Sequence, residues 1–398
     1  MNLFLIFLMN SILFYVLWSK NYYPYTQVIS HGNPDIHIST GSNNSIYKTY
    51  TENISNEFIT KKGKSMGFPY IHKTNGTLEN LNNVNSQKSD FAIVQEDLLL
   101  NDPNKYKNIQ FIGALYFESI HFMVHHYNSI ENKINSFEDL KIKKDSIPYV
   151  IATGLENSGH LQNFLMIVKS FGLKPIEITE NKLSSIGKTK KDNEIYFIRL
   201  NFEKAKKLFL EESLDGLCFT MNYKDSRIKE LTKKYLESNK NELKFLPIPY
   251  DNPILNHISN NNYYKTNIDT SVYYKEFSKH RLIPTISTRA LFVCHKNVDS
   301  KIVYLMTHVL FEKNIRFYKK IFNEYSLVPH IKYDEISYCK ENLKIHKGTY
   351  DYYKDVGQFR NKNDFKNIRN PNEYAKSKVK TYWKYDKIGK QEFTLVDS

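Results

Sequence analysis

Short apolar runs alternate with helical patterns along most of the chain, and this alternation limits the possible folds more than any other feature. Each run is short enough for a strand buried in a sheet, and the segments between runs suit helices. The strand candidates are Ile36–Thr40, Ala92–Gln95, Ile112–Tyr116, Tyr149–Ala152, Ile195–Ile198 and Gly216–Thr220. The pattern therefore predicts an α/β fold.

Two helices are predicted in some detail. Leu161 to Phe171 has apolar residues at helical spacing, with Ser158 placed as N-cap and Gly172 where a left-handed residue ends a helix. Its positive end points at the loop before it. Lys301 to Lys313 carries one apolar stripe, and surface helices ordinarily bury such a stripe in the core. A partner surface is the less favoured interpretation.

Three polar loops in the first hundred residues follow an apolar run or open a predicted helix. They are Thr40-Gly41-Ser42, Asn75-Gly76-Thr77 and Gln95-Glu96-Asp97. Backbone N–H groups and the positive ends of helices can hold an anion at such places. The loops therefore indicate a ligand cleft.

Further blocks continue in a fixed order along the chain, and together with these loops they span roughly residues 36–357. The blocks are Ala114 to His121, Ser136 to Lys141, Asn157-Ser158-Gly159, Leu214-Asp215-Gly216 and His346 to Tyr353. In these blocks the chain resembles the TAXI-type solute receptors of TRAP transporters, which capture small carboxylates outside the cytoplasmic membrane.

The resemblance implies a two-lobed fold of the periplasmic-binding-protein type II class, an α/β class with a hinge of two crossover strands. Two long strand-like segments suit the hinge, Leu115 to His125 and Ser287 to His295. Lobe one would then comprise residues 31–118 and 288–357. Lobe two would comprise residues 119–287, with an irregular Asn- and Tyr-rich insertion at 251–282.

The loops in which the chain resembles the family imply how a solute would be held between the lobes. Backbone and hydroxyl donors would bind a carboxylate, whereas Gln95 and Glu96 would suit an amine or hydroxyl, and Tyr47 and His160 would wall the pocket. The donors are Gly41, Ser42, Asn75, Gly76, Thr77, Ser158 and Gly159. The same residue types are also ordinary turn and N-cap residues, so each assignment has a plain structural alternative.

Several loop glycines of the family are replaced here by residues with side chains. Asn43-Asn44-Ser45 stands in place of a glycine-rich turn, and Met221-Asn222-Tyr223 replaces another turn. Side chains there change how closely a backbone can approach a solute. Two functions therefore stay open: a receptor that delivers its solute to TRAP-type permease subunits, and a membrane-tethered, receptor-like protein that has lost solute binding and acts through protein contacts.

Composition argues against several other classes of function. The net charge of +14 and the pI of about 9.2 accompany abundant Lys, Asn, Ile and Tyr, and no nucleic-acid recognition motif is present, so no nucleic-acid partner is expected. Metal-ligand spacing and dinucleotide or phosphate fingerprints are also missing, so neither metal nor cofactor is expected. A hydrolase using Ser158 and His160 is disfavoured because residues two apart on a turn seldom bring nucleophile and base together.

The two ends of the chain are predicted to lie outside the lobes. Residues 1–30 contain an apolar segment, Leu3 to Trp18, that suits an export signal or membrane anchor and gives a periplasmic or extracytoplasmic location. Residues 358–398 are polar and basic, as in a tail without regular structure. Cys218 and Cys294 lie in apolar runs and are expected to be buried in strands.

Overall fold

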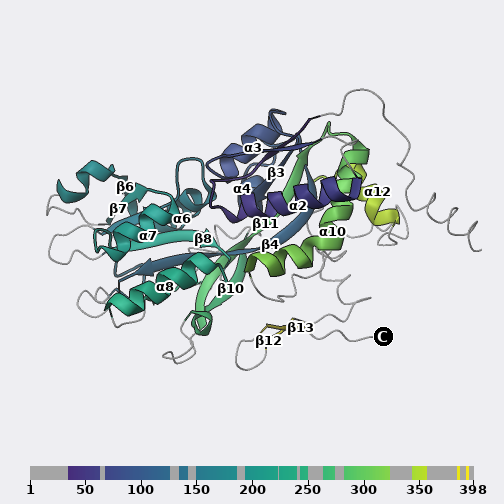
Figure 1. The fold of residues 1–398 in the computed structure, drawn as a ribbon. Coiled ribbons are helices and arrows are strands. Elements are labelled where there is room, and N and C mark those ends of the chain that lie inside the picture. Colours follow the sequence, from purple (N-terminus) through teal and green to yellow (C-terminus); the bar gives the residue numbers. More distant parts are fainter. Residues whose placement is uncertain are drawn as a thin grey trace, which may run out of the picture.

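The computed structural model describes residues 35–62, 68–125, 134–141, 149–185, 193–222, 224–239, 243–249, 263–273, 282–322, 343–355, 383–385 and 391–393. The predicted export segment lies outside these residues. Two α/β lobes stand side by side, and long strands pass from one to the other (Figure 1). The predicted fold class, two lobes with a hinge of two crossover strands, is confirmed.

One sheet of eleven strands runs through both lobes, in the order β2-β1-β3-β11-β4-β8-β5-β7-β6 with β9 and β10 attached to the side. The lobe-one strands are β1 (Ile36–Ser39), β2 (Pro69–His72) and β3 (Phe91–Gln95). The lobe-two strands are β5 (Val150–Thr153), β6 (Lys174–Glu177), β7 (Glu194–Arg199), β8 (Gly216–Met221) and β9 (Lys244–Phe245). Within each of these two sets, the neighbouring strands pair in parallel.

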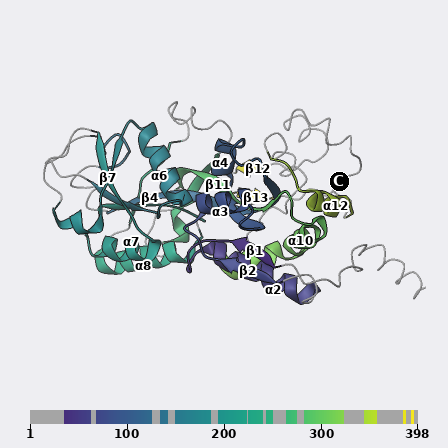
Figure 2. The same cartoon turned by 90° about the horizontal axis from the view of Figure 1, so that it is seen from above.

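Two long strands connect the lobes. β4 (Ile109–Val124) leaves lobe one, and β11 (Leu282–His295) returns to it. The two strands run side by side between the lobes (Figure 2). They pair antiparallel over most of their length, with Ser119 opposite Ser287 and Glu118 opposite Thr288. Residues at this point belong to the hinge, because a change in the angle between the lobes must bend both strands here.

Lobe one packs helices on both faces of its part of the sheet. One face carries α2 (Ile46–Lys62), α10 (Ser300–Phe322) and α12 (Lys347–Asp355), and the other carries α3 (Thr77–Asn85) and α4 (Glu96–Asn101). The apolar stripe of α10, which includes Met306, Val309 and Leu310, is buried, in agreement with the core interpretation.

Lobe two repeats this arrangement. α6 (Gly159–Ser170) covers one face of its sheet, and α7 (Phe202–Leu210) and α8 (Ser226–Asn239) cover the other. Ser158 caps α6 by accepting from the N–H of Leu161, and Gly172 has a φ of 73° just beyond the helix, as predicted. Cys218 and Cys294 are buried in β8 and β11.

Two segments predicted to lack regular structure contain strands. β10 (Tyr264–Asp269) lies in the Asn- and Tyr-rich insertion, pairs with β11 and leads into the short helix η3 (Thr270–Val272), so the expectation of an irregular insertion is wrong there. The reason is that its β-forming residues find a neighbour in β11. In the basic tail, β12 (Trp383–Tyr385) pairs with β13 (Gln391–Phe393), so the tail is not wholly irregular. Another short helix, η2 (Glu180–Ser185), follows β6.

Candidate functional site

A cavity lies between the two lobes and is lined by residues of both. It has a volume of about 90 Å³. A buried water needs roughly 10–15 Å³ of such volume, so the cavity has room for a solute of fewer than about ten non-hydrogen atoms. Its position beside the hinge means that any movement of the lobes changes its shape.

Five helices begin at the wall of this cavity. From lobe one the starts of α2 and α3 line it, and from lobe two the starts of α6, α7 and α8 do so. The helix N-termini bear residues Tyr47, Thr77, His160, Phe202 and Arg227. Each N-terminus carries a partial positive charge of about half a unit. Their convergence favours an anionic group in the cavity.

Side chains already cap four of these helices. Ser45 accepts from the N–H of Lys48 at the start of α2, and Ser158, Asn201 and Asp225 do the same for α6, α7 and α8. α3 differs, because its N-cap is Gly76, which has no side chain to offer. In each of these four cases the cap is a polar residue in the loop between a strand and its helix, and it lines the cavity.

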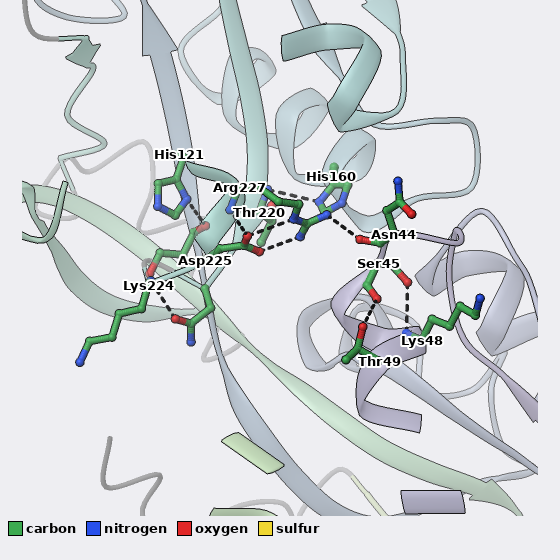
Figure 3. Close-up of polar contacts among 12 residues, drawn as sticks. Asn44, Ser45, Lys48, Thr49, His121, His160, Thr220, Lys224, Asp225 and Arg227 are labelled. Atoms are coloured by element: carbon green, nitrogen blue, oxygen red, sulfur yellow. Dashed lines mark hydrogen bonds and ion pairs between the residues drawn. The ribbon is translucent and has the colours of Figure 1, made fainter. Parts of the chain in front are cut away.

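Arg227 is the cation of the site. Its Nε donates to Asp225 Oδ1 over 3.0 Å and its Nη2 to Asp225 Oδ2 over 2.7 Å, so one carboxylate fixes the guanidinium plane. Nη1 reaches across to lobe one and donates to the carbonyl of Asn44 over 3.2 Å (Figure 3). Arg227 therefore bridges the lobes at the wall of the cavity.

Glu118 is a buried carboxyl group on β4, at the hinge, and it also lines the cavity. Its Oε2 accepts from the hydroxyl of Tyr47 over 2.9 Å and from Nε2 of Gln95 over 3.3 Å. Burial raises the pKa of Glu118 to about 8, although both of these hydrogen bonds act in the opposite direction. The carboxyl group of Glu118 is therefore mostly protonated at neutral pH.

His160 stays neutral in this site. Burial, together with the nearby positive charge of Arg227, lowers its pKa to about 4. Nδ1 accepts from the main-chain N–H of Thr220 over 3.3 Å, so the neutral ring carries its hydrogen on Nε2 (Figure 3). Ser158 uses its hydroxyl to cap α6. The two side chains thus have separate structural tasks, and their arrangement gives no support to a serine hydrolase.

The structure gathers nearly all of the predicted site residues at one cavity. Those that line it are Gly41, Ser42, Tyr47, Asn75, Gly76, Thr77, Gln95, Ser158, Gly159 and His160. Glu96 lies elsewhere: its carboxylate forms a buried, bidentate pair with Arg289 and accepts from the hydroxyl of Tyr264. Glu96 therefore supports the hinge strand β11, and the carboxyl group that faces the cavity is Glu118.

The loops at Asn75-Gly76-Thr77 and Asn157-Ser158-Gly159 face each other from opposite lobes, but they are in direct contact. The N–H of Leu78 donates to the carbonyl of Asn157 over 3.0 Å, and Gly76 packs on Ser158. A solute carboxylate has no room between them in this arrangement. The space lies beside the contact, towards Arg227 and Glu118.

Several cavity residues were not predicted from the sequence. Chief among them are Glu118, Asp225 and Arg227. A signal was present for the first: a lone carboxylate within the long apolar run of β4 must be buried, and buried carboxylates mark functional sites. Asp225 and Arg227 resemble an ordinary helix start, and only their position in space distinguishes them.

Within the part of the chain that the structure describes, no three His, Cys, Asp or Glu side chains come together as ligands for a metal ion. No described helix is both long enough and apolar enough to cross a membrane.

Comparison with protein families gives one clear match. The model of the NMT1-like family matches residues 38–357, which include both lobes and every residue of the cavity. The chain belongs to the NMT1-like family. No relative is found among curated proteins.

Solved structures with similarity to this member of the NMT1-like family have low sequence identity. XAC2383 from Xanthomonas citri bound to chloride ion has 9% identity, covering 81% of this chain and 99% of that chain, with a TM-score of 0.44. A periplasmic thiamin binding protein has 11% identity, covering 74% and 84%, with a TM-score of 0.42. The GluR0 ligand-binding core from Nostoc punctiforme in complex with L-glutamate has 11% identity, covering 73% and 100%, with a TM-score of 0.40.

Proposed function

We propose that the protein is an extracytoplasmic solute receptor that captures a small carboxylate or amino acid between its lobes. The observation that carries this proposal is the convergence of five helix N-termini and Arg227 on one cavity between the lobes. A carboxylate there gains charge-assisted hydrogen bonds from N–H donors and from the guanidinium, each worth about 1.5–3 kcal/mol.

The proposed role in transport extends the resemblance seen in the sequence. A TAXI-type receptor of a TRAP transporter would deliver the solute to membrane permease subunits, with residues 1–30 as export signal or anchor. Closure of the two lobes about β4 and β11 would present a changed surface to such a permease. The site does its work by binding, and it does not alter the solute.

Thermal-shift screening of the full chain tests the proposal. A ligand that binds only the folded state increases the free energy of unfolding and so raises the melting temperature. At a ligand concentration of a hundred times the Kd, the increase in the free energy of unfolding is about 2.7 kcal/mol. Small carboxylates and amino acids of fewer than about ten non-hydrogen atoms form the first set, chosen to match the cavity volume. A stabilising solute should also compact the molecule in solution scattering.

A second candidate function rests on one observation. The carbonyl of Asn157 occupies the N-terminus of α3, the helix start without a side-chain cap, and so takes the place that a solute carboxylate was expected to fill. This contact favours a receptor-like protein that has lost solute binding and acts through protein contacts. If no solute in the screen stabilises the chain, this second function replaces the first.

A further inference from the structure

Glu118 and Gln95 form one corner of the cavity, opposite the helix starts of lobe two. The residues are 5% and 1% exposed, so neither group is solvated by bulk water. Tyr47 and Gln95 both donate to the same oxygen, Oε2 of Glu118. Gln95 Oε1 accepts from no group among the described residues, although it is buried. An unpaired buried acceptor costs roughly 1–3 kcal/mol.

The charges of the cavity wall do not balance when Glu118 is ionised. Among the described lining residues, Glu118 and Asp225 are the acids and Arg227 is the cation, while His160 is neutral. Asp225 already neutralises Arg227 through two hydrogen bonds. No cation is hydrogen-bonded to Glu118 among the described residues, and burial without such a partner raises the pKa of its carboxyl group.

We propose that the solute carries a cationic nitrogen beside its carboxylate, as an α-amino acid does, and that this nitrogen binds at Glu118 and Gln95 with release of the Glu118 proton. This inference rests on the proposed receptor function and names the class of solute. No covalent bond of the solute changes: the carboxylic acid O–H of Glu118 breaks, and the proton passes to solvent.

Each part of the corner suits an ammonium group. Such a group has three donors, and one hydrogen bond to Gln95 Oε1 satisfies the unpaired acceptor. A second donor can pair with the Glu118 carboxylate, whose Oε2 is already held by two donors, so the anion is hydrogen-bonded as soon as the proton leaves. Because burial raises the pKa of Glu118 to about 8, binding of a cation near neutral pH must displace a proton.

The groups that face Glu118 come from every element packed around it. Tyr47 lies on α2, Gln95 ends β3, Asp97 begins α4, and Arg227 begins α8. Asp97 opposes ionisation of Glu118 and Arg227 favours it, yet the effect of burial exceeds both. Tyr47 remains neutral because burial raises the pKa of its hydroxyl well above the ordinary value. Burial raises the pKa of Asp97 only to about 6, so Asp97 is mostly ionised at pH 7, and Glu118 is the group of this corner that changes charge between pH 7 and pH 8.

Calorimetric titration of the full chain tests the inference. Two matched sets serve as probes: L-alanine with L-lactate and pyruvate, and L-aspartate with malate and oxaloacetate. At pH 7, in two buffers of different ionisation enthalpy, we expect an amino acid to bind at least tenfold more tightly than the hydroxy and keto acids of its set. Its binding should release close to one proton, and its affinity should rise with pH up to about 8.

The variant Glu118→Gln should abolish proton release and weaken amino-acid binding at least tenfold, while Glu237→Gln on the exposed surface of α8 should change neither. Should Glu118→Gln fail to fold, the pH profile of the unmodified protein decides alone. Hydroxy or keto acids that bind as tightly as the amino acid, or binding without proton release, overturn this inference and leave the receptor function standing. If none of the probes binds, both proposals fall.

Discussion

The main-chain N–H of Leu78 donates a hydrogen bond to the carbonyl oxygen of Asn157 over 3.0 Å, and this bond joins the two lobes beside the cavity. It depends on a close approach of Gly76 to Ser158 and of Gly159 to Gln95. Gly76 adopts a φ of 131°, which residues with side chains rarely reach. Contact between the lobes therefore requires glycine at both places.

The first prediction concerns this contact. A methyl group added at Gly159 would overlap Oε1 of Gln95, whose buried side chain cannot move away without loss of its bond to Glu118. We therefore expect Gly159→Ala to hold the lobes apart and to weaken solute binding at least tenfold, about 1.4 kcal/mol.

Calorimetry measures the affinity of this variant for the solute, and solution scattering measures the shape of the molecule. Ser213→Ala, on an exposed turn after α7, is the control. Unchanged affinity in a folded Gly159→Ala protein would contradict the prediction.

The second prediction separates the structural task of Arg227 from its proposed contact with solute. Removal of the guanidinium in Arg227→Met leaves Asp225 buried without its cation, and breaking a buried pair costs about 3–5 kcal/mol. We expect the lower part of this range, because the Arg227 side chain is partly exposed. The double variant Arg227→Met with Asp225→Asn should recover most of the stability but not carboxylate binding. Chemical denaturation and calorimetry measure the two effects. A double variant that binds the carboxylate as tightly as the parent would show that Arg227 does not contact the solute.

The sequence predicted the fold well because apolar runs and helix caps are local signals. Ser158 before α6 and Gly172 after it mark the helix by chemistry that needs no distant partner. β10 was missed because its Asn- and Tyr-rich residues become a strand through pairing with β11, more than a dozen residues further along the chain.

The site was predicted less completely than the fold, for a physical reason. Loops that end strands on the same side of a sheet must meet, so Gly41, Gln95 and Ser158 could be placed together from their positions alone. Glu96 at the start of α4 and Glu118 on β4 are both buried, and only the direction of its side chain decides whether each one faces the cavity. That direction is set by the partner Arg289 in one case and by Tyr47 in the other, both distant in sequence.

The third prediction concerns another hydrogen-bonded bridge between the lobes, at Tyr263. The Tyr263 hydroxyl lies 2.6 Å from Asp97 Oδ2 in lobe one and 3.1 Å from Asn163 Oδ1 in lobe two. Tyr263→Phe leaves a buried carboxyl group with one donor fewer, which costs about 1–3 kcal/mol. We expect a lower melting temperature and a more open molecule in scattering. Tyr70→Phe, on exposed strand β2, is the matched control. Identical melting curves for Tyr263→Phe and the parent would show that the bridge adds nothing to stability.

The fourth prediction follows from the burial of Asp97, which raises its pKa from 3.8 to about 6 despite its bonds to Tyr263 and Thr288. An acid with a raised pKa contributes stability that is fully present below its ordinary pKa and is lost as pH rises through the raised value. Relative to Asp97→Asn, the parent protein should therefore lose stability between pH 4 and pH 6.5, on the order of 2 kcal/mol. Buried His121 and His160, whose pKa values fall to about 4, make the folded protein more stable as pH rises. Both histidines are present in the parent and in the variant, so their effect cancels in the difference between the two free energies of unfolding. Urea unfolding at a series of pH values measures the free energies of unfolding of the parent and Asp97→Asn, with Glu237→Gln as the exposed control. A difference that stays constant over this range would show that Asp97 ionises in the folded protein as readily as in the unfolded chain.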